Sequence, residues 1–191
     1  AAIDQLFQAL QPVVAKHGVK PGQVILIHGQ FIRPDQVQEL KSLGIFPSMF
    51  PMHTFYWGDW YKQIVGPAQA AQISPMRSIL NTGLHATSHT DAPVALPNLM
   101  QVVWATVNRT SRSGTVIGPD ERVTPYEAMK MITLWGAEQF GEQATKGSIQ
   151  EGKLADLVVL SDNPLTVDPA TINQIQVLET IKEGKTVWVR D

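Results

Sequence analysis

Cysteine is absent from the 191-residue sequence. Disulfide bonds and thiolate metal ligands are therefore excluded, and any metal site has to use histidine, aspartate, glutamate or a modified lysine. The sequence also has no apolar run near the roughly 20 residues that a membrane-spanning helix requires. Its first residues lack the basic, apolar and small-residue pattern of a secretion signal. We expect a protein of a reducing compartment, the cytoplasm, without a membrane partner.

Charge is also scarce. Charged residues make up 17% of the sequence and the formal net charge is −2, so no basic excess is present. A basic excess is what attracts nucleic acids and anionic membrane surfaces, and neither is expected as a partner. Hydrophobic residues make up 43% of the sequence, which is typical of a globular protein with a substantial core.

Helical and strand-like patterns alternate over the first half of the sequence. In order, we predict helices over 3–14, 34–43 and 74–81 and strands over 24–28, 45–50 and 84–87. This alternation predicts an α/β fold with a parallel sheet, and the apolar runs favour strands that are covered on both faces. The first element is a helix with no strand before it, so we expect further sequence in front of Ala1.

The second half has helical patterns first and strand-like patterns afterwards. One helix is predicted over 98–112. A second is predicted to run from a capping box at Thr124 and Glu127 to Phe140. After Gly147, strand-like segments cover 157–160, 177–181 and 186–189, and the last two flank a hairpin turn. We predict a domain over 1–146 and a small β part over 147–191.

An aromatic segment from Phe55 to Tyr61 separates the second strand from the helix that begins at Ser74. We predict a long connection here, because long loops at the functional face of a barrel are usually lids or pocket walls. Phe55, Tyr56 and Trp57 are therefore candidates for substrate contact. The alternative is that they only provide apolar cover for the barrel mouth.

Polar residues follow each of the three predicted strands. His28 ends the first strand, His53 follows the second, and Asp91 follows the third. The carboxyl ends of successive parallel strands meet at one edge, where barrel enzymes have their active sites. Imidazole and carboxylate groups are the ligands of hydrolytic metal ions. The pattern predicts part of a hydrolytic metal site.

Each of these residues has a simpler interpretation. His28 could be a hydrogen-bonded structural residue instead of a metal ligand. His53 could cap its strand instead of contacting a substrate or stabilising a transition state. Asp91 could form an Asx turn before Pro93 instead of binding a cation. His89, two residues before Asp91, could be a pocket residue or a hydrogen-bond partner of Asp91.

Four motifs resemble those of the amidohydrolase superfamily. The most similar branch is the YtcJ-like one, which includes N-substituted formamide deformylases. The motifs are Ile27-His28-Gly29-Gln30, Pro51-Met52-His53, His89-Thr90-Asp91-Ala92-Pro93-Val94 and the segment from Gly147 to Val158. The stretch from Gly152 to Val159 is the most specific, and together the motifs extend over nearly the whole chain in the expected order.

The resemblance implies a (β/α)8 TIM barrel with a small β-sandwich, of which this chain would be the C-terminal part from about strand six to strand eight. It implies that His28 on strand six and Asp91 on strand eight bind a divalent metal, with zinc as the expected ion. Asp91 would also act as the general base, and His53 would contact the substrate. His89 replaces a small residue that is common at its position and would line the substrate pocket.

The family's other metal-binding residues have no counterpart in this sequence. These are histidines of strands one and five and a lysine or glutamate near strand four, and we expect them in a missing N-terminal part. The open sheet edges would pair with that part or with a second copy of the chain.

The expected function is hydrolysis of a non-peptide C–N bond of a small molecule, of the amide or formamide type. The chain alone would then be inactive. A deaminase or esterase on the same scaffold is one alternative, and a non-catalytic binding or assembly domain is another.

Overall fold

The computed structural model describes residues 1–20 and 22–191. Its central sheet has three parallel strands in the order β1-β2-β3. These strands are β1 (Ile25–His28), β2 (Phe46–Met49) and β3 (Thr87–Ser88). Helix α1 (Ala2–His17) precedes β1, and α2 (Pro34–Ser42) connects β1 to β2. The predicted α/β alternation and the parallel sheet are confirmed.

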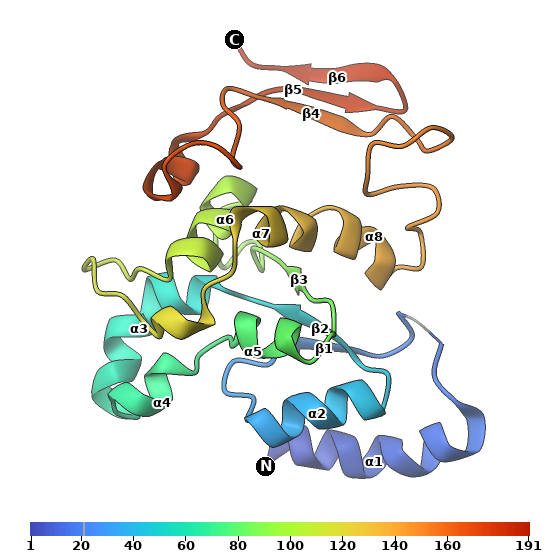
Figure 1. Cartoon of the computed structure of the whole chain (residues 1–191), viewed down its shortest axis with the longest axis vertical. Helices are drawn as coiled ribbons and strands as arrows, with labels where there is room; N and C mark the ends of the chain where they lie inside the picture. The colour runs from blue at the N-terminus through green and yellow to red at the C-terminus, as the bar shows by residue number, and fades with distance from the viewer. Residues whose placement is uncertain (21) are drawn as a thin grey trace.

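The helices after β3 lie between the central sheet and a second sheet (Figure 1). They are α6 (Leu99–Asn108), α7 (Pro125–Met131) and α8 (Leu134–Gln139), and both α7 and α8 contact β3. The main core forms where helices pack on the central sheet, and its fully buried side chains include Leu40, Met49, Ile79 and Met131. None of the described helices combines the length and apolarity that crossing a lipid bilayer would require.

The second sheet is antiparallel, in the order β4-β5-β6. Its strands are β4 (Leu157–Leu160), β5 (Val177–Lys182) and β6 (Lys185–Val189). The predicted hairpin is confirmed, with Glu183 at φ 49° and Gly184 at φ 77° in the turn. Two positive φ values are typical of a tight turn whose twist matches the flanking strands.

The segment before β5 attaches the second sheet to α6. It contains the 3-10 helix η2 (Pro169–Gln174), whose Ala170 carbonyl accepts a hydrogen bond from Trp104 Nε1 at 2.9 Å. A groove of about 970 Å³ lies beside this attachment, and its lining includes Leu99, Ile132, Val158 and Ile175. The residues that line this groove come from α6, the segments around α7 and the second sheet.

The aromatic segment is helical, and the prediction of a long loop there was wrong. Helix α3 (Met52–Ile64) is followed by α4 (Pro67–Ala71) and α5 (Met76–Asn81). Thr54 and Gly58 lie one turn apart on the buried side of α3. A Cβ atom at Gly58 would lie 2.8 Å from Ile117 Cγ1, so glycine permits this close packing. Tertiary packing of that side stabilises a helix that aromatic content alone does not favour.

Three further predictions needed correction. The helix expected over 124–140 is divided into α7 and α8, and the Thr133 hydroxyl donates to the Met129 carbonyl beside the break. Such a bond competes with the helical backbone pattern and bends helices. The helix expected over 98–112 ends at Asn108, because Arg109 adopts a left-handed conformation at φ 52°. The strand expected over 84–87 is the short β3 (Thr87–Ser88).

The expectation that the parallel strands are covered on both faces was also wrong in one place. Ile27, in the middle of β1, is 60% exposed. This exposed residue marks one face of the central sheet that the described residues leave partly open.

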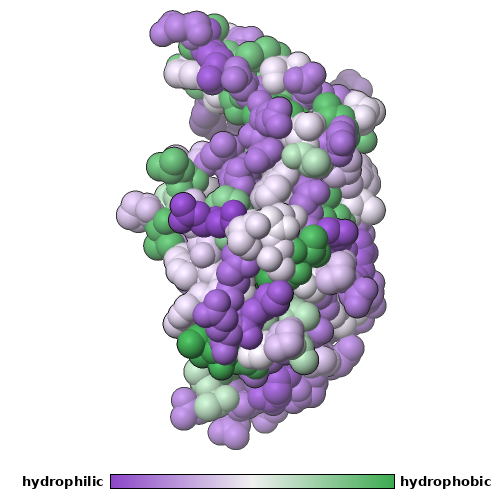
Figure 2. Space-filling model, turned by 90° about the vertical axis from the view of Figure 1, so that its left-hand side faces the viewer, coloured by the Kyte–Doolittle hydropathy of each residue, from purple (hydrophilic) through white to green (hydrophobic). Residues whose placement is uncertain are grey.

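Figure 2 shows the face of the molecule that carries α3 and α4, where hydrophilic and hydrophobic side chains are interspersed.

A two-pronged ion pair connects α5 to α7. Arg77 donates to both carboxylate oxygens of Glu127, at 2.9 and 2.5 Å, and Glu127 also accepts the backbone N–H of Thr124 at 2.7 Å. The Arg77 guanidinium is the main cause of the low pKa of Glu127, which falls from 4.5 to about 2. The predicted capping box is confirmed by the reciprocal bond from Glu127 N to the Thr124 hydroxyl.

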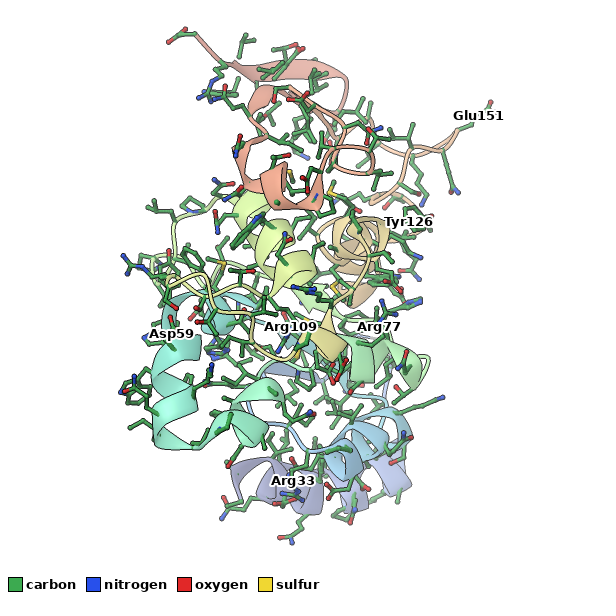
Figure 3. All side chains as sticks on the ribbon, turned by 60° about the vertical axis from the view of Figure 1, so that its left-hand side comes forward. Arg33, Asp59, Arg77, Arg109, Tyr126 and Glu151 are labelled. Atoms are coloured by element: carbon green, nitrogen blue, oxygen red, sulfur yellow. The ribbon has the colours of Figure 1, made fainter. Side chains whose placement is uncertain are left out.

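We predict that Glu127→Gln lowers the free energy of unfolding at pH 7 by about 1–2 kcal/mol. Since the pKa of Glu127 is lower in the folded state, this stabilisation is present above about pH 4.5 and is lost as the pH falls toward 2. Urea unfolding between pH 3 and 7 measures the effect. The matched control is Glu151→Gln, because Glu151 is exposed on a projecting loop (Figure 3). Equal pH dependence of the two variants would contradict the prediction.

Candidate metal centre

The strand register brings the predicted site residues to one edge of the central sheet. His28 pairs with Met49 at the end of β1 and β2, and Met49 pairs with Ser88 at the end of β3. The next residue, His89, donates its backbone N–H to the Met49 carbonyl at 3.1 Å. His28 and His89 therefore emerge next to each other although they are far apart in the sequence.

His28, His89 and Asp91 form a compact cluster of possible metal ligands. One ligand atom from each residue lies within 4.8 Å of the other two. His28 Nε2 lies 3.3 Å from Asp91 Oδ2. The rings of His28 and His89 are stacked, with centroids 5.3 Å apart and planes inclined by 20°. This set offers two imidazoles and a carboxylate, which is the donor chemistry of zinc and similar divalent ions.

The cluster contains polar atoms that need a partner. Nε2 of His28 and Nε2 of His89 are both buried, and neither has a hydrogen-bond partner among the described residues. Buried polar atoms without partners are costly and rare in folded proteins. A bound cation satisfies such nitrogen atoms directly, so these residues fit the metal that the donor set suggests.

The backbone at two cluster residues is strained. His28 has φ 70° and Asp91 has φ 53°, in the left-handed region that residues with a Cβ seldom adopt. Conformations of this kind cost about 1–3 kcal/mol each and persist where the surrounding structure enforces them, often at functional sites.

His53 lies beside the cluster, in the first turn of α3. Its ring contacts Phe50 at a centroid distance of 4.7 Å and His28 at 5.5 Å. The sequence predicts that His53 contacts the substrate, and the structure leaves this residue only 7% exposed. Burial, followed by the repulsion of charge on His28 and His89, lowers the pKa of His53 to about 4. The imidazole is therefore neutral near pH 7 and able to exchange hydrogen bonds.

Burial also lowers the pKa of His89, and the neighbouring His28 adds to this effect. A neutral imidazole has a free lone pair, which metal binding requires.

The aromatic candidates divide into two groups. Trp57 lies next to His53, at a centroid distance of 5.9 Å. Phe55 instead packs edge-to-face against Trp104 of α6, at 5.9 Å, and against Tyr56.

Two residues that the sequence reasoning missed support His53. The Ser74 hydroxyl lies 3.4 Å from His53 Nδ1 and donates to the Phe50 carbonyl at 3.2 Å. Arg109 is 1% exposed and lies in the interior of the molecule (Figure 3). Its guanidinium donates to the carbonyls of Ser74 at 3.0 Å, Ile73 at 2.7 Å, Ala71 at 3.3 Å and Ile117 at 2.8 Å.

Arg109 therefore fixes the loop that carries Ser74, whose own φ is 46°. Burial lowers the pKa of Arg109 to about 10, so the guanidinium is charged at neutral pH. One signal in the sequence could have revealed this residue. Arg109 directly follows the ten residues of α6, none of which is charged. An arginine at the end of such an uncharged helix is a candidate for a buried role.

Comparison with known proteins gives a match over almost the whole chain. The family model described as "Amidohydrolase family" matches residues 1–188. The N-substituted formamide deformylase of Arthrobacter pascens is 31% identical over 160 residues, which are 83% of this chain and 30% of that protein. The putative amidohydrolase YtcJ of Bacillus subtilis is 24% identical over 189 residues, which are 97% of this chain and 36% of that protein. The chain thus spans about a third of the length of these relatives.

Solved structures with a similar fold include metal-dependent hydrolases. A metal-dependent hydrolase from Pyrococcus horikoshii superimposes with a TM-score of 0.70 at 19% identity, over 88% of this chain and 33% of that one. An adenosine deaminase from Xanthomonas campestris with bound zinc gives 0.64 at 17% identity, over 95% of this chain and 43% of that one. At this level of identity the likeness concerns the fold.

We predict that Arg109→Met lowers the free energy of unfolding by about 3 kcal/mol or more, because four buried carbonyls lose a charged donor. Thermal and urea unfolding measure the loss. The exposed Arg190 provides the matched control, and Arg190→Met should change stability by less than about 0.5 kcal/mol. A similar small effect of both substitutions would show that the Arg109 network contributes little.

Proposed function

Because the chain belongs to the amidohydrolase family, we propose that it supplies part of the active site of a metal-dependent hydrolase. His28 and Asp91 are the proposed ligands of the ion. The observation that carries this proposal is the approach of His28 Nε2 to Asp91 Oδ2, 3.3 Å, at the carboxyl edge of a parallel sheet. Two ligands of one ion lie at about this separation, and barrel enzymes have their active sites at this edge.

We further propose that the three parallel strands are strands six to eight of a (β/α)8 barrel, with residues 147–191 as part of a small β-sandwich. The order β1-β2-β3 and the partly open face at Ile27 support this arrangement. The length of the relatives supports it as well. The other ligands and the strands that pair with the open edges would then come from residues outside this sequence or from a second copy of the chain.

In this proposal the side chains around the ion have distinct roles. A bound divalent ion, with zinc as the expected one, supplies Lewis-acid activation of water and of the scissile carbonyl. Asp91 accepts a proton from the attacking water and passes it to the leaving nitrogen. His53, neutral near pH 7, exchanges a hydrogen bond with the substrate, and the Ser74 hydroxyl orients its ring. Trp57, beside His53, would contact the substituent next to the scissile bond.

The proposed substrate is a small molecule with a non-peptide C–N bond, of the amide or formamide type. The similarity to an N-substituted formamide deformylase supports this choice. Deamination of an amino-heterocycle is the second candidate, since 5-methylthioadenosine/S-adenosylhomocysteine deaminases are among the relatives and match 47% and 70% of this chain. Both reactions place water on a carbon bonded to nitrogen, so the same ligands and base serve either one.

We predict that the protein at its natural length hydrolyses N-substituted formamides and releases formate together with the amine. Ammonia release from amino-heterocycles identifies a deaminase, and hydrolysis of matched esters identifies an esterase. Removal of the metal by a chelator should abolish turnover, and added Zn²⁺ should restore it. Turnover that survives complete metal removal would contradict the proposed function.

We also predict that Asp91→Asn lowers kcat by about 10²–10⁴-fold, because an amide cannot accept the proton from water. Steady-state kinetics on the substrate identified in the panel measure the change. Asp162→Asn, at an exposed residue of the loop after β4, controls for the loss of a carboxylate as such. If Asp91→Asn kept near wild-type turnover, the assignment of the base would be wrong.

A further inference from the structure

The sequence predicts that His89 lines the substrate pocket, and the structure places its ring against the proposed ligand His28. The two rings are stacked, and the His89 ring also stacks on Phe50, whose centroid lies 5.5 Å away. Nε2 of His89 is buried, like Nε2 of His28.

Nε2 of His89 has no hydrogen-bond partner among the described residues, so this nitrogen is free to bind a cation. The backbone N–H of His89 donates to the Met49 carbonyl at 3.1 Å, which holds this residue against the end of β2. The structure therefore keeps a free ring nitrogen of His89 next to the proposed ligand His28.

We propose that His89 is a third ligand of the ion that His28 and Asp91 hold. This inference rests on the proposed function in one respect, since both place an ion at His28 and Asp91. It goes beyond that function because His89 adds a third ligand from this chain to the two that the proposed function assigns.

The distances agree with one ion between the three side chains. Ligands of a tetrahedral zinc ion, with bonds of about 2.0–2.1 Å, lie about 3.3 Å from one another. His28 Nε2 and Asp91 Oδ2 have this separation, 3.3 Å. All three ligand atoms lie within 4.8 Å of one another.

The donor set also agrees with a site for a catalytic ion. Two histidines and one carboxylate hold the ion in several zinc hydrolases, and the fourth position stays open for water or substrate. Asp91 is only two residues from His89, and its left-handed φ of 53° turns the chain at this point. The turn after β3 therefore provides two of the three ligands, and β1 provides the third.

Metal titration of the 191-residue chain tests this inference without an activity assay. Co²⁺ is added while the visible absorption is recorded, and Zn²⁺ binding is measured by calorimetry. We expect one ion per chain, and we expect His89→Ala and His28→Ala each to weaken binding by at least about tenfold. The matched control is His85→Ala, because His85 stacks on Trp135 at 4.6 Å and not on the cluster; its affinity should equal that of the wild type.

Three results would overturn the inference, and each bears differently on the proposed function. Wild-type affinity of His89→Ala, with loss in His28→Ala, excludes His89 as a ligand and leaves the proposed function intact. Failure of the wild-type chain to bind shows that three residues do not suffice, and a site with ligands from outside this sequence still stands. Binding that neither His28→Ala nor His89→Ala changes places the ion elsewhere, and both proposals fall.

Two further measurements guard against a variant that does not fold. Circular dichroism compares each variant with the wild type, and His89→Gln replaces the ring with a polar side chain of similar length. In the wild-type chain, NMR signals of the imidazole nitrogens report directly on Zn²⁺. We expect the Nε2 signals of both His28 and His89 to shift on Zn²⁺ addition, whereas an unchanged His89 signal would overturn the inference.

Discussion

The register of the parallel sheet is the constraint on which the site depends. His28, Met49 and Ser88 lie side by side at the ends of β1, β2 and β3, so the residues that follow these strands share one edge. A shift of one residue in β1 would turn the His28 side chain to the opposite face. Buried side chains of the core, among them Met49 of β2 and Leu40 of α2, pack together in this register. The hydrophobic core thus determines where the polar groups meet.

The sequence was sufficient to predict the elements with a strong local pattern. The α/β alternation, the capping box at Thr124 and the hairpin at Glu183 follow from periodicity and turn chemistry, and each is confirmed. The sequence also placed His28 and Asp91 at strand ends, and the register brings them together. These features were predictable because each depends on residues near one another in the sequence or on the general geometry of parallel strands.

The remaining features depend on contacts between distant segments, which one sequence does not reveal. Helix α3 forms because its buried side packs against other segments, as Gly58 does against Ile117. The role of Arg109 depends on four carbonyl groups from two other loops, which meet only in the folded chain. The stacking of His89 on His28 is of the same kind, because it joins residues on different strands.

The candidate site contains features that destabilise the folded chain, and contacts in the surrounding structure offset them. His28, Asp91 and Ser74 all have positive φ values, and Nε2 of His28 and of His89 are buried without a hydrogen bond to any of the described residues. These features oppose folding, each by about 1–3 kcal/mol. The Arg109 network, the ion pair of Arg77 with Glu127 and the buried core act in the opposite direction. This surrounding structure brings imidazoles and a carboxylate close together before any ligand binds. A cation at the proposed site would meet its ligands in place, and its binding would in turn stabilise the strained residues.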